Sequence, residues 1–229
     1  MSALVESAYF GILMTAAAYC AATAVQKKTG LVICNNLLIS ALLIGAVLTA
    51  FHIPYDAYYQ GGSVINSLLG PATACLAVNI YQKRELLKQY WLPVLAGCTA
   101  GALTSVGSIL LLCRVFGLER ELIVSLLPKS VTTPIATAVA EGNGCIVPIA
   151  VAGVLYTGVL GNLLAPLLIK LFRVKDPVAA GLGIGACSHA VGTAKALEIG
   201  ATEGAMSSLA IGLCGIVTAV AALSFEFLV

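Results

Sequence analysis

The chain has 229 residues, of which 60% are apolar and 10% are charged, whereas a soluble globular domain carries about 25% charged residues. This composition excludes a soluble domain, and a mean hydropathy of +1.02 over the whole length excludes a soluble enzyme with one membrane anchor. The net charge of +2 is too balanced to indicate nucleic-acid binding. The sequence therefore predicts an all-α polytopic membrane protein, with residues 1–229 forming a single integral membrane domain.

Several apolar runs are long enough to cross a bilayer as helices, which takes about 20 residues. The uninterrupted runs are 7–25, 31–53, 91–113, 145–169 and 204–225. A sixth run, 63–81, contains Gly70 and Pro71. We expect this pair to kink the helix while still allowing it to cross. Together these runs predict about six transmembrane helices.

Two further runs, 122–142 and 178–203, carry polar residues near their middle. The first contains Lys129 within Pro128–Pro134, and the second contains His189 within Cys187–Lys195. A charge at bilayer depth costs a few kcal/mol, so such segments face protein or a water-filled cavity. Broken backbone is tolerated under the same condition. Both runs therefore predict broken or re-entrant helical hairpins.

The positive-inside rule separates crossing from re-entrant hairpins, because it counts Lys and Arg near the ends of spans. If both runs cross, five basic residues lie on each side, and the rule gives no orientation. If both turn back, the count becomes eight cytoplasmic against two external, with Lys129 and Lys195 inside the membrane. The eight are Lys27, Lys28, Lys83, Arg84, Lys88, Lys170, Arg173 and Lys175, and the two are Arg114 and Arg120. We prefer the second arrangement, with both termini outside.

The two broken runs also resemble each other. At an offset of 60, Val131, Thr133 and Ala136 match Val191, Thr193 and Ala196, and four more identities follow at an offset of 62. Identities in an apolar background also arise by accident. In the preferred topology the hairpins enter from opposite sides, so segments 122–169 and 178–229 are predicted to be inverted repeats. Inverted repeats with interrupted helices are typical of secondary transporters.

A helix interrupted inside the membrane presents unpaired N–H groups and a positive dipole end, which together favour an anion. Hydroxyl groups and close backbone approach would add donors for a carboxylate, Lys129 and Lys195 would balance its charge, and His189 would exchange protons near neutral pH. The predicted substrate-binding residues are Lys129, Ser130, Thr132, Thr133, Pro134, Ser188, His189, Gly192, Thr193 and Lys195.

Each of these residues also has a structural interpretation. The two lysines reach an interface if their segments lie near the surface. In this interpretation, His189 only forms a hydrogen bond between helices. The prolines and threonines then only kink their helices. The coincidence of all these features in two related segments favours the functional interpretation.

An enzyme is the weaker class, because the chain lacks H-E-x-x-H, a G-K-[ST] phosphate loop and G-x-G-x-x-G. Ser188 and His189 are adjacent on one segment and do not easily pair as nucleophile and base. The cysteines occur singly, without C-x-x-C spacing or partnering histidines. We expect no catalytic residues, no metal site and no cofactor.

The string Pro128-Lys129-Ser130-Val131-Thr132-Thr133-Pro134-Ile135-Ala136 and the string Ser188-His189-Ala190-Val191-Gly192-Thr193-Ala194-Lys195-Ala196 resemble the LrgB/CidB family. The resemblance extends to Leu68–Thr73 and to the final apolar segment with Gly215, and so covers most of the chain. Neither motif departs from the family pattern.

The resemblance implies two functions. Bacterial members are described as holin/antiholin-like modulators of murein hydrolase activity and cell lysis, with a small LrgA/CidA-type partner. A plant plastid relative carries glycolate and glycerate, and bacterial relatives are linked to pyruvate. We expect a multi-pass protein of the bacterial inner (plasma) membrane that carries small monocarboxylates or 2-hydroxycarboxylates, such as glycolate, glycerate, pyruvate or lactate. A homodimer is expected from the small size, and the lysis regulator remains the alternative.

Overall fold

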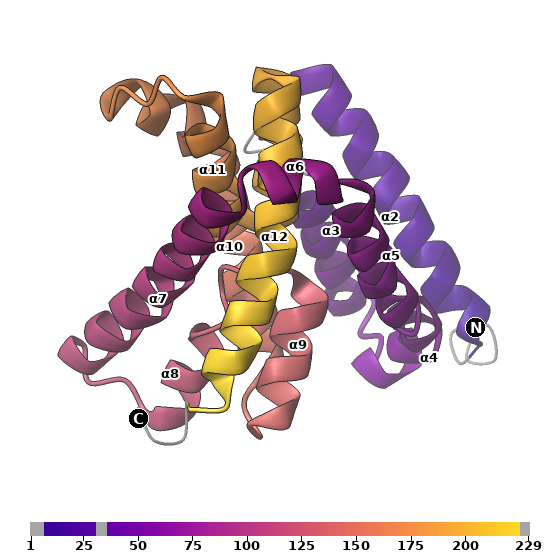
Figure 1. Ribbon diagram of the computed structural model, residues 1–229. Coiled ribbons are helices and arrows are strands. Elements are labelled where there is room, and N and C mark those ends of the chain that lie inside the picture. The colour runs from indigo at the N-terminus through magenta and orange to yellow at the C-terminus, as the bar shows by residue number, and fades with distance from the viewer. Residues whose placement is uncertain (1–6, 31–35, 225–229) are drawn as a thin grey trace. The chain divides into compact units, whose positions relative to one another are not determined.

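The computed structural model describes residues 7–30 and 36–224, which form helices joined by short turns without any strand (Figure 1). Contacts divide the chain into two compact units, Met1–Ala72 and Thr73–Val229. Among the described residues, four helices are long and apolar enough to cross a membrane: α2 (Ala8–Thr29), α7 (Trp91–Val115), α10 (Val147–Leu171) and α12 (Ala201–Ala222). They coincide with the predicted spans 7–25, 91–113, 145–169 and 204–225, so the prediction of an all-helical polytopic membrane protein is confirmed. The start of the run 31–53 and the end of 204–225 lie outside the described residues.

The first unit contains α2, α3 (Asn36–Ala50) and α4 (Tyr55–Asn66). Ser7 caps the start of α2 by accepting a hydrogen bond from the Tyr9 N–H, and Gly30 ends it at a φ of 65° that suits glycine. Helices α2 and α4 cross at Gly11 and Gly61, where an added Cβ on either glycine would meet the backbone of the other helix. The first unit is therefore assembled on a glycine crossing that brings two backbones together.

We expect the substitution Gly61→Val to destabilise the first unit by about 3 kcal/mol, because backbone atoms of α2 cannot move aside as a flexible side chain can. The measurement is thermal unfolding of the detergent-solubilised protein. Gly45→Val on α3 is the matched control, because nothing lies within 4 Å of a Cβ there. Equal stability of the two variants would contradict the crossing.

The run 63–81 is not one kinked helix. It is divided between α4 and α5 (Leu69–Gln82), with the break at Ser67 and Leu68. The predicted kink at Gly70 and Pro71 is wrong in position, because these residues lie in the first turn of α5, where a proline costs no intrahelical hydrogen bond. The described part of α3 has 15 residues and α5 has 14. At about 1.5 Å per residue, α5 falls short of a 30 Å hydrocarbon core.

The second unit contains α6 (Arg84–Gln89), α7, α8 (Arg120–Leu126), α9 (Thr133–Gly142), α10, α11 (Pro177–Ile199) and α12. The run 122–142 corresponds to α8 and α9, joined by the turn 127–132. The Ile146 N–H beyond the end of α9 donates to the Ser125 hydroxyl on α8 over 3.0 Å. Two helices continuing in one direction would place these residues more than about 20 Å apart, so the chain turns back. We name 120–142 hairpin 1.

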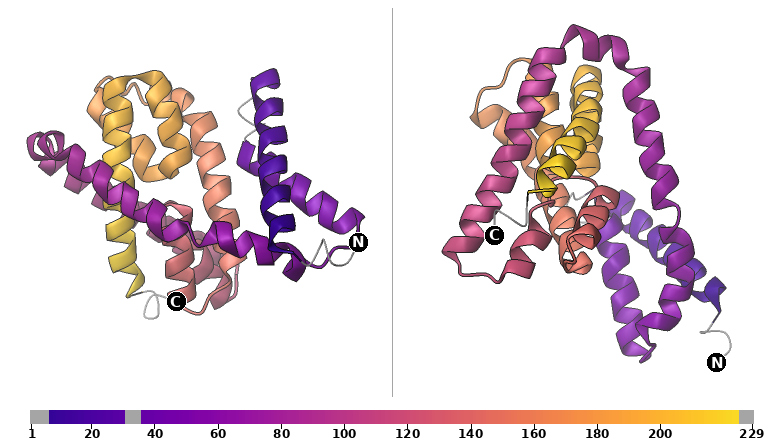
Figure 2. Two further views of the ribbon diagram at one scale, coloured as in Figure 1. Left: turned by 90° about the vertical axis from the view of Figure 1, so that its right-hand side faces the viewer. Right: turned by 60° about the horizontal axis from the view of Figure 1, so that its bottom comes forward.

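The run 178–203 also turns back. His189 interrupts α11 with φ 42° and ψ −141°, and divides it into residues 177–188 and 190–199. Ile184 and Ala196, on opposite sides of this break, belong to one apolar cluster. Gly181 and Gly185 in the first half approach Glu203 and Ser207 of α12 in the same order, so this half runs parallel to α12. We name 177–199 hairpin 2 (Figure 2, left).

The second half of hairpin 2 runs antiparallel to α12. Leu197 lies against Gly204, and the Thr193 hydroxyl contacts that of Ser207, so positions earlier in this half meet positions later in α12. The two halves of α11 therefore run in opposite directions, which is the geometry of a re-entrant segment rather than of a crossing helix.

The two hairpins enter the second unit from opposite ends. Hairpin 2 descends along the first half of α7, where Leu182 and Ala186 face Gly97 and Gly101. Hairpin 1 lies along the second half, where Val124 and Leu127 share an apolar cluster with Val106 of α7. The hairpin tips therefore meet near the middle of α7. Opposed hairpins are what an inverted repeat produces, although the repeat boundaries themselves stay a prediction.

The basic residues of the second unit lie at its two ends in unequal numbers. Tyr90, at the start of α7, and Asp176, at the start of α11, line the same groove. Lys83, Arg84 and Lys88 precede α7, and Lys170, Arg173 and Lys175 precede α11, so all six belong to one end. Arg114 and Arg120 belong to the opposite end, beside hairpin 1. This is the distribution predicted for re-entrant hairpins and not that for crossing ones.

Candidate functional site

The tips of the two hairpins rest on one helix, α10. The Val154 side chain packs with Val131 and Ala136 of hairpin 1. The Val154 carbonyl oxygen is 2.9 Å from Nε2 of His189 in hairpin 2. One turn of a continuous helix thus contacts both interruptions, which brings together segments that lie about 60 residues apart in the sequence.

Lys129 lies at the tip of hairpin 1 within a small hydroxyl cluster. Its ammonium group donates to the Ser130 hydroxyl over 3.1 Å and to the Ser105 hydroxyl of α7 over 3.4 Å. The two hydroxyls are 2.8 Å apart. Arg84, Lys88 and Lys195 form ion pairs with glutamates, whereas Lys129 forms none within the described ranges. An opposite charge near a half-buried ammonium favours its charged form, and here the contacts shown are with neutral hydroxyl oxygens.

Thr132 adds a second unusual group. It is 6% exposed and occupies the N-cap of α9, but its side chain makes no cap hydrogen bond. Among the side chains that the structure describes, its hydroxyl is the buried polar atom without a hydrogen-bond partner. An N-cap threonine ordinarily accepts from the first turn of its helix. Here the hydroxyl is available beside an N-terminus that favours negative charge. Thr133 and Pro134 form the first turn of that helix and are half-buried.

His189 forms the tip of hairpin 2 in a conformation that non-glycine residues rarely adopt. Its φ of 42° costs about 1–3 kcal/mol and is tolerated where surrounding contacts fix it. The side chain is 3% exposed. Because a carbonyl oxygen only accepts, Nε2 carries the proton in the bond to Val154, and Nδ1 of the neutral ring is the acceptor. A second proton therefore binds at Nδ1.

The surface of α10 is shaped to receive this tip. A Cβ on Gly158 would lie 2.6 Å from the imidazole Cε1, and a Cβ on Gly161 would overlap the Ser188 side chain. The Asn162 side-chain amide donates to the Val191 carbonyl oxygen over 2.8 Å. Two glycines and two hydrogen bonds thus hold the interruption of α11 against α10.

The remaining predicted residues of hairpin 2 serve packing or lie farther along it. Thr193 donates to the His189 carbonyl oxygen over 2.9 Å and is 2.6 Å from the Ser207 hydroxyl, so it is fully bonded inside the protein. Gly192 gives room to Ser188 and Ile184. Lys195 forms an ion pair with Glu198 over 2.7 Å. Its charge is therefore balanced within hairpin 2, in contrast to the predicted pairing with Lys129 on one anion.

Sequence reasoning missed several groups at the site. Ser105, Asn162 and Ser207 each interrupt an apolar span with a polar side chain, and that pattern was sufficient to find them. Glu198, three residues after Lys195, is at a helical spacing that predicts an ion pair. The role of the Val154 carbonyl could not be predicted from the sequence, because every residue has a backbone carbonyl.

The sequence profile of the LrgB-like family matches residues 15–227. The chain belongs to the LrgB-like family. With the four long apolar helices, this membership makes it a multi-pass protein of a bacterial membrane.

LrgB-like relatives match this chain along nearly its whole length. The uncharacterised protein YxaC of Bacillus subtilis (strain 168) is 38% identical over 205 residues, which are 90% of this chain and 89% of that protein. The antiholin-like protein LrgB of the same strain is 36% identical over 213 residues, covering 93% and 92%. The antiholin-like protein LrgB of Bacillus mycoides (strain KBAB4) is 34% identical over 213 residues, covering 93% of each chain. No solved structure matches.

Proposed function

We propose that this LrgB-like protein is a secondary transporter of small monocarboxylates or 2-hydroxycarboxylates, which bind between the tips of the two hairpins. The observation that carries the proposal is the Lys129 ammonium group, which only neutral hydroxyl oxygens hold. The unpartnered hydroxyl of Thr132 lies three residues further along the same tip. A carboxylate would supply the missing negative charge and an acceptor for that hydroxyl.

The charge of the site favours a monoanion over a dianion. Lys129 contributes one positive charge, whereas the charge of Lys195 is balanced by Glu198. Neutral His189 adds none. A second negative charge would be left without a partner in a low-dielectric region, which is costly. Glycolate, glycerate, pyruvate and lactate each carry one negative charge and are the substrate class that we propose.

The hairpin geometry supports alternating access. Transporters built from inverted repeats bind their substrate near the middle of the membrane. Hairpin tips that enter from opposite ends support a binding position near the middle of α7 and α10. Nδ1 of His189 can take up a proton at the tip of hairpin 2, so uptake would be coupled to protons. Hairpin movement would then expose the site to one side of the membrane at a time.

The test is uptake into proteoliposomes of labelled glycolate, glycerate, pyruvate and lactate, with and without an inward proton gradient. We expect saturable uptake of at least one of them, faster with the gradient. Labelled succinate is the control, because a dianion should be taken up at least about tenfold more slowly than the best monoanion. Vesicles that accumulate none of the four monocarboxylates above the empty-liposome level would refute the proposal.

A second candidate function comes from the names of two relatives, which are antiholin-like proteins. In this alternative, the chain is a holin/antiholin-like regulator of murein hydrolase activity and cell lysis that acts with an LrgA/CidA-type partner. Such a regulator would release neutral and charged solutes alike, or act only with its partner present. A dye-release assay on the same proteoliposomes separates the two functions, and crosslinking in them tests the proposed homodimer.

A further inference from the structure

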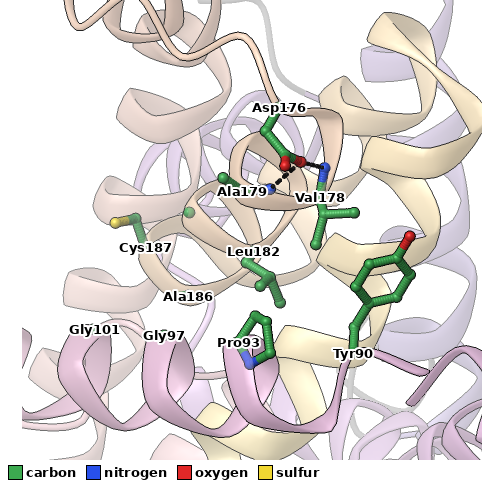
Figure 3. Close-up of a pocket in the computed structure, with 11 residues that line it drawn as sticks. Tyr90, Pro93, Gly97, Gly101, Asp176, Val178, Ala179, Leu182, Ala186 and Cys187 are labelled. Carbon is green, nitrogen blue, oxygen red and sulfur yellow. Dashed lines mark hydrogen bonds between the residues drawn. The ribbon is translucent and has the colours of Figure 1, made fainter. Parts of the chain in front are cut away.

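A groove of about 450 Å³ runs between α7 and the first half of hairpin 2 in the second unit (Figure 3). Small and apolar side chains form most of its walls, and its volume is within the range of small-molecule pockets. Its main landmarks are Tyr90, Gly97 and Gly101 on one wall and Asp176, Leu182 and Cys187 on the other.

The groove leads toward Lys129. Its outer end lies at Tyr90 and Asp176, and its inner end at Gly101 and Cys187 (Figure 3). One turn of α7 beyond Gly101 is Ser105, whose hydroxyl accepts a hydrogen bond from Lys129. The exposed Cys187 lines this inner end of the groove. The inner end of the groove therefore adjoins the positive charge of the candidate site.

The charges along the groove suit an anion moving inward. Asp176 is the acidic residue in the lining, and its carboxylate accepts hydrogen bonds from the Val178 and Ala179 N–H groups. This cap places its negative charge on the positive end of α11, which reduces its repulsion of other anions. At the inner end, the charge of Lys129 has no acidic partner among the residues that the structure describes.

We propose that this groove is the water-filled route by which a small monocarboxylate reaches Lys129 from the end that carries six basic residues. That end is cytoplasmic by the positive-inside rule. The route rests on the proposed function for the identity of its anion. A volume of about 450 Å³ accommodates the anion with several waters, since one water takes about 30 Å³. A lipid chain or a helix of a second copy would be the competing occupants.

Thiol labelling tests the route without depending on transport. Cys187 is kept as the one cysteine, and inside-out vesicles are treated with an anionic or a cationic methanethiosulfonate reagent. We expect the anionic reagent to react about fivefold faster, because the Lys129 charge attracts it. Lys129→Gln should remove this preference. Reaction with a membrane-permeant maleimide but with neither charged reagent would overturn the route and indicate lipid or protein in the groove.

Blocking the groove tests whether substrate uses it. Gly97→Leu adds bulk inside the groove, where a Cβ would meet only Leu182 Cδ1 at 3.8 Å. Gly107→Leu is the matched control on the same helix, because it lies outside the groove and its Cβ would meet nothing within 4 Å. Gly183→Leu, with equal space, repeats the block from the other wall.

We expect Gly97→Leu and Gly183→Leu to slow both Cys187 labelling and monocarboxylate uptake about tenfold, which corresponds to 1.4 kcal/mol. Gly107→Leu should change neither by more than twofold. Normal uptake by both blocked variants would overturn the route and leave the proposed function intact. Charge-selective labelling in a protein that takes up no monocarboxylate would support an anion route and refute the proposed function.

Discussion

Lys129→Gln should weaken monocarboxylate uptake about 100-fold, whereas Lys195→Gln should change it by less than about threefold. Removing one partner of a largely desolvated charge pair costs about 3 kcal/mol, which is a factor of 100 in affinity. Lys195 instead forms an ion pair with Glu198, whose side chain is 68% exposed, and exposed pairs contribute 1 kcal/mol or less. The measurement is the initial uptake rate as a function of substrate concentration in proteoliposomes.

The two lysine variants control for each other, since both remove one positive charge and keep a side chain of similar length. Lys129→Arg retains the charge and should recover part of the uptake, which a purely structural role in the Ser105 and Ser130 cluster would not predict. Equal losses in Lys129→Gln and Lys195→Gln would instead support the two-lysine site predicted from the sequence. Gel filtration in detergent shows whether each variant is folded.

Gly161→Ala should reduce uptake at least about tenfold, because its methyl group would overlap the Ser188 hydroxymethyl group and push the tip of hairpin 2 off α10. Rotating Ser188 does not relieve the overlap, since the Ser188 Cβ itself is too close. The displaced tip would lose the hydrogen bonds from His189 and Asn162. The measurements are uptake and the accessibility of a cysteine introduced at Val191.

A second substitution distinguishes this steric account from general instability. Adding Ser188→Gly to Gly161→Ala removes the Cβ that causes the overlap and should restore uptake by about fivefold or more. Full recovery is not expected, because a glycine destabilises a helix by about 1 kcal/mol. Adding Ser188→Ala keeps the Cβ and should restore little. Ser188→Ala alone reports the contribution of the hydroxyl. Similar recovery in both double variants would contradict the steric account.

Much of this architecture was predictable from local patterns. Apolar runs predict α2, α7, α10 and α12, because each residue of a lipid-exposed helix contributes separately to the free energy of membrane insertion. The break in run 63–81 was predicted three residues too late, since Pro71 is compatible with a first helical turn and the break depends on how Ser67 and Leu68 end α4. The re-entrant hairpins followed from counting basic residues, which is a property of the whole chain.

The candidate site was only half predictable. Lys129, Ser130 and Thr132 lie where their motif indicates, because a broken tip of six residues brings them together locally. The offset of 60 that relates the two motifs places His189, and not Lys195, opposite Lys129. Lys195 lies six residues beyond the tip, nearly two helical turns away, and Glu198 on the next turn balances it. The spacing of Lys195 and Glu198 was visible in the sequence, but their distance from the tip depended on where α11 breaks.

The sequence by itself determined that this chain lies in a bilayer and where its four long apolar helices run. It also indicated that two further segments are interrupted and that each carries a charged group. Only the tertiary structure decided which of those charges is left without a partner. Membrane helices are predictable from the sequence because they depend on the solvation of each residue. The contact of both hairpin tips with Val154 instead depends on how α7, α10 and α12 pack around glycines. That packing leaves Lys129 as the unbalanced charge and opens a groove toward it.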